Sequence, residues 1–158
     1  MQTRYEIVAD LINSNHYKKV AEIGVMDGTT SQYLLHHCDL EKLILVDTTF
    51  SKLNNTINTA NYKNLELIEK DSLEASRMVG DKTLDLVFID ADHYYESVLK
   101  DIIFWLQKIK PGGCICGHDY GEGFDCRGVR RAVNEIFPKA NLIKDSIDDV
   151  IHVWYVYI

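Results

Sequence analysis

Short apolar runs alternate with amphipathic segments along the chain, which is the pattern expected of an α/β protein. Five apolar runs predict buried strands, at 20–23, 43–47, 65–68, 84–90 and 114–117. Apolar residues at helical spacing predict helices around these runs, at 3–15, 30–37, 51–60, 98–109 and 129–137, with a further helix start at Asp71. Strands that alternate with helices imply right-handed parallel crossovers, so a doubly wound sheet is expected.

The end of the chain has a different pattern. Two strand-like segments, 141–145 and 150–158, lie on either side of the short polar segment from Asp145 to Asp149. Such spacing predicts a hairpin, and therefore an antiparallel pair at the end of the sheet. No internal repeat or linker interrupts the chain, and we expect one domain over residues 1–158.

Composition narrows the partners of this domain. The formal net charge of −7 argues against nucleic acid, since binding to its phosphates depends on clustered Lys and Arg. No apolar run approaches the roughly 20 residues that span a bilayer, so no membrane partner is expected. The first ten residues lack the apolar core of a secretory signal. We therefore expect a cytoplasmic protein with reduced thiols and a small-molecule substrate.

Polar residues follow the predicted strands at their carboxyl ends. In a doubly wound sheet, ligands bind beyond these ends. The residues placed there are Asp27, Asp47, Asp71, Asp90, His93, His118 and Asp119. Their convergence predicts one functional site.

The loop after the first strand is rich in glycine and acid. Gly24 and Gly28 allow a tight turn and a close approach to a ligand or the next helix, which Thr29 or Thr30 can cap. A dinucleotide loop usually reads G-x-G-x-x-G, but Met26 occupies the middle-glycine position. The acidic loop suits the ammonium and sulfonium of S-adenosylmethionine better than a pyrophosphate. An NAD-dependent oxidoreductase is the weaker alternative.

Several longer segments resemble a known family. EIGVMDG, LVD, KDS, LVFIDADHYYESV and LKDIIFWLQKIKPGGCICGHDY are similar to segments of class I S-adenosylmethionine-dependent methyltransferases. The similarity is greatest to small bacterial members that carry a D-G-D-H-x-Y and a later G-H-D-Y segment. It extends from about Val20 to Phe137, with Ala91 in place of the commoner glycine.

The resemblance implies a Rossmann-like, seven-stranded, mostly parallel sheet with an antiparallel C-terminal strand. It also implies positions for the methyl donor. Glu22 and Gly24 would border its methionine, Asp47 its ribose, Asp71 and Ser72 its adenine, and Asp90 its methyl end. The candidate cofactor-binding set is completed by the loop residues Asp27, Gly28 and Thr29.

The candidate catalytic residues are His93, His118 and Asp119. Methyl transfer is an in-line displacement, so the protein must align the acceptor and, for a hydroxyl, remove its proton. A small-molecule acceptor with an oxygen nucleophile is expected, with nitrogen as the alternative. For His118 the sequence leaves two roles open, a general base or a residue that orders a loop.

Three further questions stay open at this level. Catechol-type relatives hold a divalent ion with an Asp and an Asp-Asn pair, which Asp90 and Asp119 match, although Tyr120 replaces Asn. Magnesium, calcium or manganese would suit such oxygen ligands. The alternative is a hydrogen-bond network of Asp90, Asp92, His93, His118 and Asp119. The acceptor side is open, or is covered by the loop 121–128 or a second subunit of a homo-oligomer. A non-catalytic subunit that binds S-adenosylmethionine would share all these features.

Overall fold

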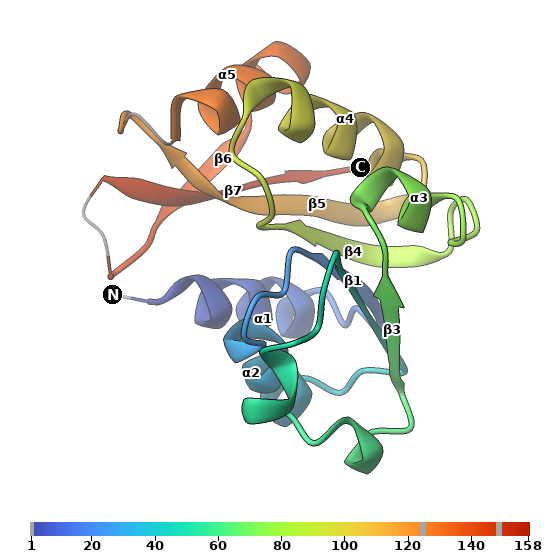
Figure 1. Cartoon of the computed structure of the whole chain (residues 1–158). Helices are drawn as coiled ribbons and strands as arrows, with labels where there is room; N and C mark the ends of the chain where they lie inside the picture. The colour runs from blue at the N-terminus through green and yellow to red at the C-terminus, as the bar shows by residue number, and fades with distance from the viewer. Residues whose placement is uncertain (1, 124–125, 148–149) are drawn as a thin grey trace.

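A seven-stranded sheet between two helical layers forms the body of the protein (Figure 1). The computed structural model describes residues 2–123, 126–147 and 150–158. The strands are β1 Lys19–Ile23, β2 Lys42–Asp47, β3 Leu65–Glu69, β4 Leu84–Ile89, β5 Ile109–Gly121, β6 Asn141–Lys144 and β7 Ile151–Tyr157. The α-helices are α1 Arg4–Ser14, α2 Thr29–His37, α3 Ser72–Ser76, α4 Tyr95–Leu106 and α5 Arg127–Ile136.

The order of the strands is β3-β2-β1-β4-β5-β7-β6. β1 to β5 are mutually parallel, whereas β7 lies antiparallel between β5 and β6. The predicted seven-stranded, mostly parallel sheet with an antiparallel last strand is confirmed. The order reverses between β1 and β4, and a crevice for ligands forms at such a switch point.

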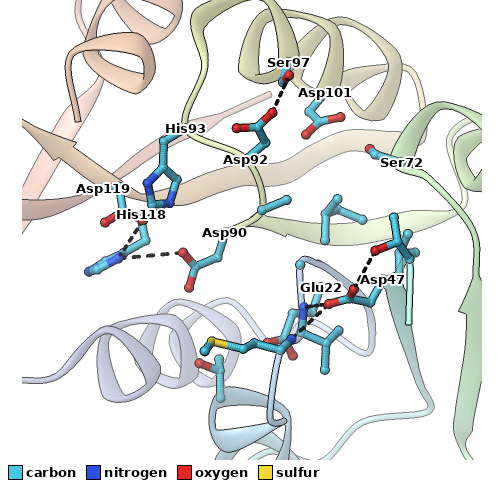
Figure 2. A pocket seen from close by; sticks show the side chains of 18 of the residues that line it. Glu22, Asp47, Ser72, Asp90, Asp92, His93, Ser97, Asp101, His118 and Asp119 are labelled. Carbon is cyan, nitrogen blue, oxygen red and sulfur yellow. Dashed lines mark hydrogen bonds and ion pairs between the residues drawn. The ribbon is translucent and has the colours of Figure 1, made fainter. Parts of the chain in front are cut away.

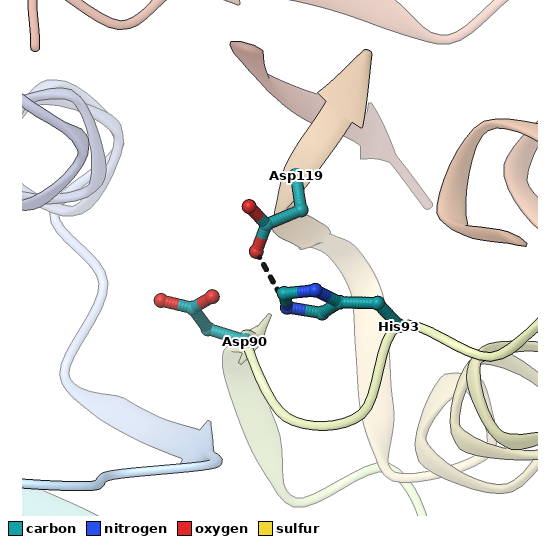
Figure 3. A group of neighbouring side chains, drawn as sticks. All are labelled: Asp90, His93 and Asp119. Carbon is teal, nitrogen blue, oxygen red and sulfur yellow. Dashed lines mark ion pairs between the residues drawn. The ribbon is translucent and has the colours of Figure 1, made fainter. Parts of the chain in front are cut away.

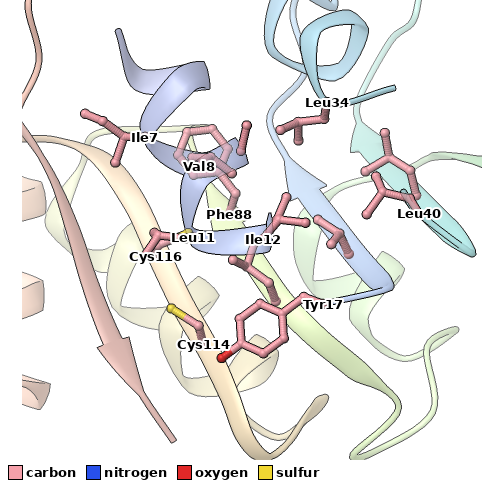
Figure 4. Packing of buried hydrophobic residues seen from close by; sticks show 14 of the residues in the cluster. Ile7, Val8, Leu11, Ile12, Tyr17, Leu34, Leu40, Phe88, Cys114 and Cys116 are labelled. Carbon is pink, nitrogen blue, oxygen red and sulfur yellow. The ribbon is translucent and has the colours of Figure 1, made fainter. Parts of the chain in front are cut away.

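The two helical layers explain why the strands read as continuous apolar runs. Alternate side chains of a strand point to opposite faces, and both faces are covered. On one face Phe88 and Cys116 pack against α1 and its neighbour α2 (Figure 4). On the other face Ile89 and Ile115 pack against α3, α4 and α5. None of the helices in the described part of the chain has the length and apolar character needed to cross a membrane.

Two predicted helices differ in the structure. The segment from Ser51 forms only two short 3-10 turns, η1 Leu53–Asn55 and η2 Thr59–Asn61. Its many Asn and Thr residues have low helix propensity, which outweighs the helical spacing of its apolar residues. The helix predicted to reach Ile109 ends at Leu106, and Ile109 pairs with Leu84 as the first residue of β5. The predicted hairpin between β6 and β7 is confirmed, although Asp148 and Asp149 of its turn lie outside the described residues.

Candidate functional site

A cleft of about 990 Å³ opens at the carboxyl ends of the parallel strands. Figure 2 shows Asp90, His93, His118 and Asp119 grouped on one side of it, with Asp47 and Ser72 on the other. The predicted site residues that line it are Glu22, Gly24, Asp27, Asp47, Asp71, Ser72, Asp90, His93, His118 and Asp119. The chain segments that carry them are far apart in sequence, so the parallel topology itself assembles this wall.

Gly24 is required where β1 meets the end of β4. Its φ is +85°, and a Cβ on it would lie 2.3 Å from the carbonyl oxygen of Asp90. The Asp90 amide also donates to Ile23 O at 2.8 Å, which fixes the two strand ends together. Only glycine tolerates both the conformation and the contact.

The other two loop residues predicted to bind the cofactor, Gly28 and Thr29, are not among the described residues that line the cleft. Gly28 packs instead against η1, where a Cβ on it would lie 2.4 Å from Leu53 Cδ1. Thr29 donates through its amide and its hydroxyl to Asp27 Oδ1, at 3.0 and 2.9 Å. Asp27 therefore accepts hydrogen bonds at the start of α2, and of the two threonines there only Thr30 lines the cleft.

Glu22 is a buried carboxyl in the cleft wall, only 2% exposed. Burial raises its pKa to about 8, a shift that the hydrogen bond from the Ser31 hydroxyl and the charge of Arg4 only partly oppose. At neutral pH the ionised form of this group is therefore destabilised in the fold. A cation in the cleft would relieve that cost.

We expect Glu22→Gln to stabilise the protein by about 3 kcal/mol at pH 7, at 1.36 kcal/mol per pKa unit. The folded pKa lies above the ordinary value of 4.5, so the wild type loses stability as pH rises from about 4.5 to about 8. The variant should lack this loss, and the difference should vanish at pH 4. Urea unfolding across this range measures it. Glu66→Gln, a half-exposed glutamate of β3, is the control, and equal pH profiles for wild type and Glu22→Gln would contradict the prediction.

Asp47 connects the end of β2 to the glycine loop. Its Oδ2 accepts hydrogen bonds from the amides of Val25 and Met26 at 2.8 and 3.0 Å, and its Oδ1 accepts from the Thr49 amide at 3.2 Å. Burial opposes ionisation, but these hydrogen bonds outweigh it and lower the pKa of Asp47. Asp47 is thus an anion that supports the loop and faces the cleft.

At the β3 end of the cleft, Asp71 caps α3 by accepting from the Glu74 amide at 3.0 Å, as predicted. Ser72 accepts a hydrogen bond from Trp105 Nε1 at 2.8 Å. Its hydroxyl also bonds to Asp101, whose pKa burial raises to about 6. No sequence motif indicates Asp101, which reaches the cleft from the middle of α4.

His118 lies buried among carboxyl groups. Its Nε2 is 3.0 Å from Asp145 Oδ2, and its Nδ1 is 3.3 Å from Asp119 Oδ2 and 3.8 Å from Asp90 Oδ1. Burial disfavours the charged ring, but the carboxyl groups outweigh it and raise the pKa of His118 above 6.5. With both ring nitrogens facing carboxyl oxygens, this residue connects β5 to the β6–β7 hairpin and presents no free basic nitrogen.

His93 is more open to the cleft, with a side chain that is 39% exposed. Its Nε2 is 2.8 Å from Asp119 Oδ2. This hydrogen bond is the main cause of a pKa of His93 raised above 6.5. Asp119 has the left-handed φ of 56° at a break in the β5–β7 pairing, which turns its carboxyl group toward both histidines.

The network suggested by the sequence is therefore only partly formed. Asp92 accepts from the Tyr94 amide at 3.1 Å and the Ser97 hydroxyl at 2.7 Å, so it begins α4 and does not contact the histidines (Figure 2). The Tyr120 hydroxyl donates to Asn134 of α5. Side-chain oxygen and nitrogen atoms of Asp90, His93 and Asp119 lie within 4.8 Å of one another (Figure 3), close enough to hold a metal ion.

Residues far from every motif complete the cleft. Arg4 reaches it from α1, while Asp145, Ile147 and Ile151 reach it from the β6–β7 hairpin. The Ser146 amide donates to Gln2 O at 2.8 Å, which joins this hairpin to the N-terminal segment. Of the predicted cover, Gly121 to Gly128, residues 124 and 125 lie outside the described ranges.

The acidic wall, the converging strand ends and the glycine turn are features of a site for a cationic nucleoside. Residues 21–120, well over half of the chain, match the profile of a family described as "Methyltransferase domain". The chain belongs to this family. The methyltransferase family predicted from the sequence is thereby confirmed.

Individual similar proteins extend the comparison. The chain is 27% identical over 126 residues to "uncharacterized protein R132" of Acanthamoeba polyphaga mimivirus; the match covers 73% of the chain and 57% of that protein. The O-methyltransferase from Bacillus cereus, solved in complex with S-adenosylhomocysteine, superposes with a TM-score of 0.74, at 18% identity and coverages of 98% and 80%. N-methyltransferase NodS from Bradyrhizobium japonicum superposes with a TM-score of 0.71, at 16% identity and coverages of 98% and 93%. The shared fold therefore accommodates both oxygen and nitrogen acceptors.

Proposed function

We propose that this methyltransferase transfers the methyl group of S-adenosylmethionine to a hydroxyl oxygen of a small-molecule acceptor, with His93 as the general base. The observation that carries this proposal is the 2.8 Å contact between His93 Nε2 and Asp119 Oδ2, beside an acidic cleft. Asp119 would orient the ring and stabilise the imidazolium that forms when His93 accepts the proton.

The charge of the cleft supports the donor. Nine of its lining residues are Asp or Glu, against three that are Lys or Arg, and such a wall attracts the sulfonium and ammonium of S-adenosylmethionine. In the proposed complex Glu22, Gly24 and Asp27 border the methionine part. Asp47 takes the ribose hydroxyls, Asp71 and Ser72 border the adenine, and Asp90 lies near the methyl group.

The positions of the two histidines support His93, rather than His118, as the general base. His93 follows β4 and is partly exposed, so it can face an acceptor placed in line with the methyl group. His118 is only 7% exposed and has carboxyl oxygens at both ring nitrogens. We therefore assign His118 to positioning Asp119 and the hairpin.

A divalent ion is the second mechanistic candidate. Two carboxyl groups and one imidazole within 4.8 Å are donors that suit magnesium, calcium or manganese. Asp90, His93 and Asp119 would hold it, and it would lower the pKa of the acceptor hydroxyl. His93 could then not serve as the base, so the two mechanisms exclude each other.

The proposal is tested in two steps. Calorimetry with S-adenosylhomocysteine should show binding, whereas binding of NAD alone would favour an oxidoreductase. Turnover of labelled S-adenosylmethionine is then measured with hydroxyl and amine acceptors, with EDTA or with added Mn²⁺. Transfer to a hydroxyl in EDTA supports His93 as the base, and transfer only with Mn²⁺ supports the metal. Binding without transfer to any acceptor would favour a non-catalytic subunit.

Asp47→Ala should weaken S-adenosylhomocysteine binding by about 1.5 to 3 kcal/mol, the value of hydrogen bonds to a charged group. Two losses contribute, the ribose contact and the support of the Val25 and Met26 amides. Calorimetry measures the affinity, and Asp39→Ala, an exposed aspartate paired with Lys18, is the control. Unchanged affinity would show that the ribose is bound elsewhere.

A further inference from the structure

Arg4 is a cation in the cleft wall that no motif of the sequence indicates. It is the first residue of α1 and lines the cleft. Its Nε lies 3.3 Å from Asp90 Oδ2, an ion pair without hydrogen-bond geometry. The same Nε is buried and has no hydrogen-bond acceptor among the described residues. The pairing with Asp90 therefore leaves a buried N–H of the guanidinium free to donate a hydrogen bond to a ligand.

The neighbours of Arg4 show which part of the cleft it serves. Burial raises the pKa values of Glu22 and Asp90, and the charge of Arg4 partly opposes both shifts. The same charge adds to the hydrogen bonds from Thr29 that lower the pKa of Asp27. These three groups lie at the ends of β1 and β4 and in the glycine loop. The other Lys and Arg residues of the described wall, Lys70 and Lys100, precede Asp71 and Asp101 in sequence. Arg4 therefore supplies positive charge at the opposite end from the proposed adenine position.

An α-amino acid group carries a partner for each of the two groups at this end of the cleft. A cation would stabilise the ionised form of the buried Glu22 carboxyl, and a carboxylate would accept the hydrogen bond that Arg4 Nε does not make among the described residues. A ligand with only an ammonium would satisfy Glu22 but leave Arg4 without an acceptor, and one with only a carboxylate would face the surrounding acidic groups. A zwitterion satisfies both.

We propose that Arg4 binds the carboxylate at the amino-acid end of S-adenosylmethionine while Glu22 accepts its ammonium. This assignment rests on the proposed function and deepens it. A guanidinium can donate two parallel hydrogen bonds to one carboxylate, so Arg4 selects methyl donors that retain this group. The same chemistry could come from a carboxylate on the acceptor, and the test below separates the two sources.

The test compares three ligands by calorimetry on wild type and Arg4→Ala: S-adenosylhomocysteine, its decarboxylated analogue, and 5′-methylthioadenosine, which lacks the whole amino-acid end. Arg4→Ala should lose about 10- to 100-fold in affinity for S-adenosylhomocysteine, the range for a charge-assisted hydrogen bond. Its affinity for the other two ligands should stay close to that of the wild type. Arg4→Lys should recover part of the loss, because a lysine restores the charge but not the paired hydrogen bonds.

Retained binding of 5′-methylthioadenosine shows that the variant is folded, and Arg77→Ala, an exposed arginine after α3, is the matched control. Equal losses for all three ligands would overturn the assignment, since Arg4 would then only maintain the fold. Unchanged S-adenosylhomocysteine affinity, with a raised KM for an acidic acceptor, would overturn it in favour of the acceptor. A wild type that binds none of the three ligands refutes the proposed function itself, and the assignment with it.

Discussion

His93→Ala lowers turnover by about 100- to 10,000-fold, the usual contribution of a general base, and leaves the affinity for S-adenosylhomocysteine nearly unchanged. The reason is that the proposed function places His93 on the acceptor side of the cleft, where it would affect only the proton transfer. Single-turnover rates and calorimetry on the same preparations separate the two effects. His36→Ala, an exposed histidine in the last turn of α2, should retain wild-type turnover.

The pH dependence gives a second measure of the same role. His93 must be neutral to accept a proton, and its hydrogen bond to Asp119 raises its pKa above 6.5. The kcat/KM of the wild type should therefore fall as pH decreases through a value above 6.5. Asp119→Asn should remove most of the rate, and the double variant should lose little more, because the two residues act as a unit. A loss below tenfold in His93→Ala would exclude it as the base.

His118→Ala destabilises the protein by about 3 to 5 kcal/mol, the cost of breaking a buried ion pair. Asp90, Asp119 and Asp145 surround the ring, and its removal leaves buried carboxyl groups without their shared cation. Because the folded pKa of His118 is raised above 6.5, this contribution is complete below pH 6.5 and is lost as pH rises through the folded pKa. Denaturant unfolding of both proteins at pH 6 and pH 9 measures the loss of stability in His118→Ala, which should be larger at pH 6 than at pH 9.

A second substitution distinguishes this structural role from a catalytic one. Asp145→Asn in the His118→Ala background should restore part of the stability, because it removes one of the buried acidic groups. Turnover per folded molecule should fall far less in His118→Ala than in His93→Ala. Wild-type stability together with a large loss of turnover would instead identify His118 as the base.

Local pattern was sufficient for most of the fold. The continuous apolar runs of β2 and β4 predicted strands covered on both faces, and the polar turn before β7 predicted the antiparallel pair. These features depend on the periodicity of apolar and polar side chains, which can be read directly from the sequence. The pattern was insufficient from Ser51 onward, where Leu53 and Ile57 have helical spacing but the intervening polar residues prevent a helix.

The sequence by itself determined that four acidic residues lie at or near the carboxyl ends of parallel strands: Glu22, Asp47, Asp90 and Asp119. These ends meet at one edge of the sheet, whatever path the chain takes from one strand to the next. Only the tertiary structure decided which side chains meet. Arg4 and Asp145 lie in segments without a motif, and their packing beside β4 and β5 brings charge to Asp90 and His118. That packing also gives the two histidines different environments, since His118 is buried among carboxyl groups and His93 faces the cleft. Their distinct roles follow from burial and partners, which a linear pattern does not specify.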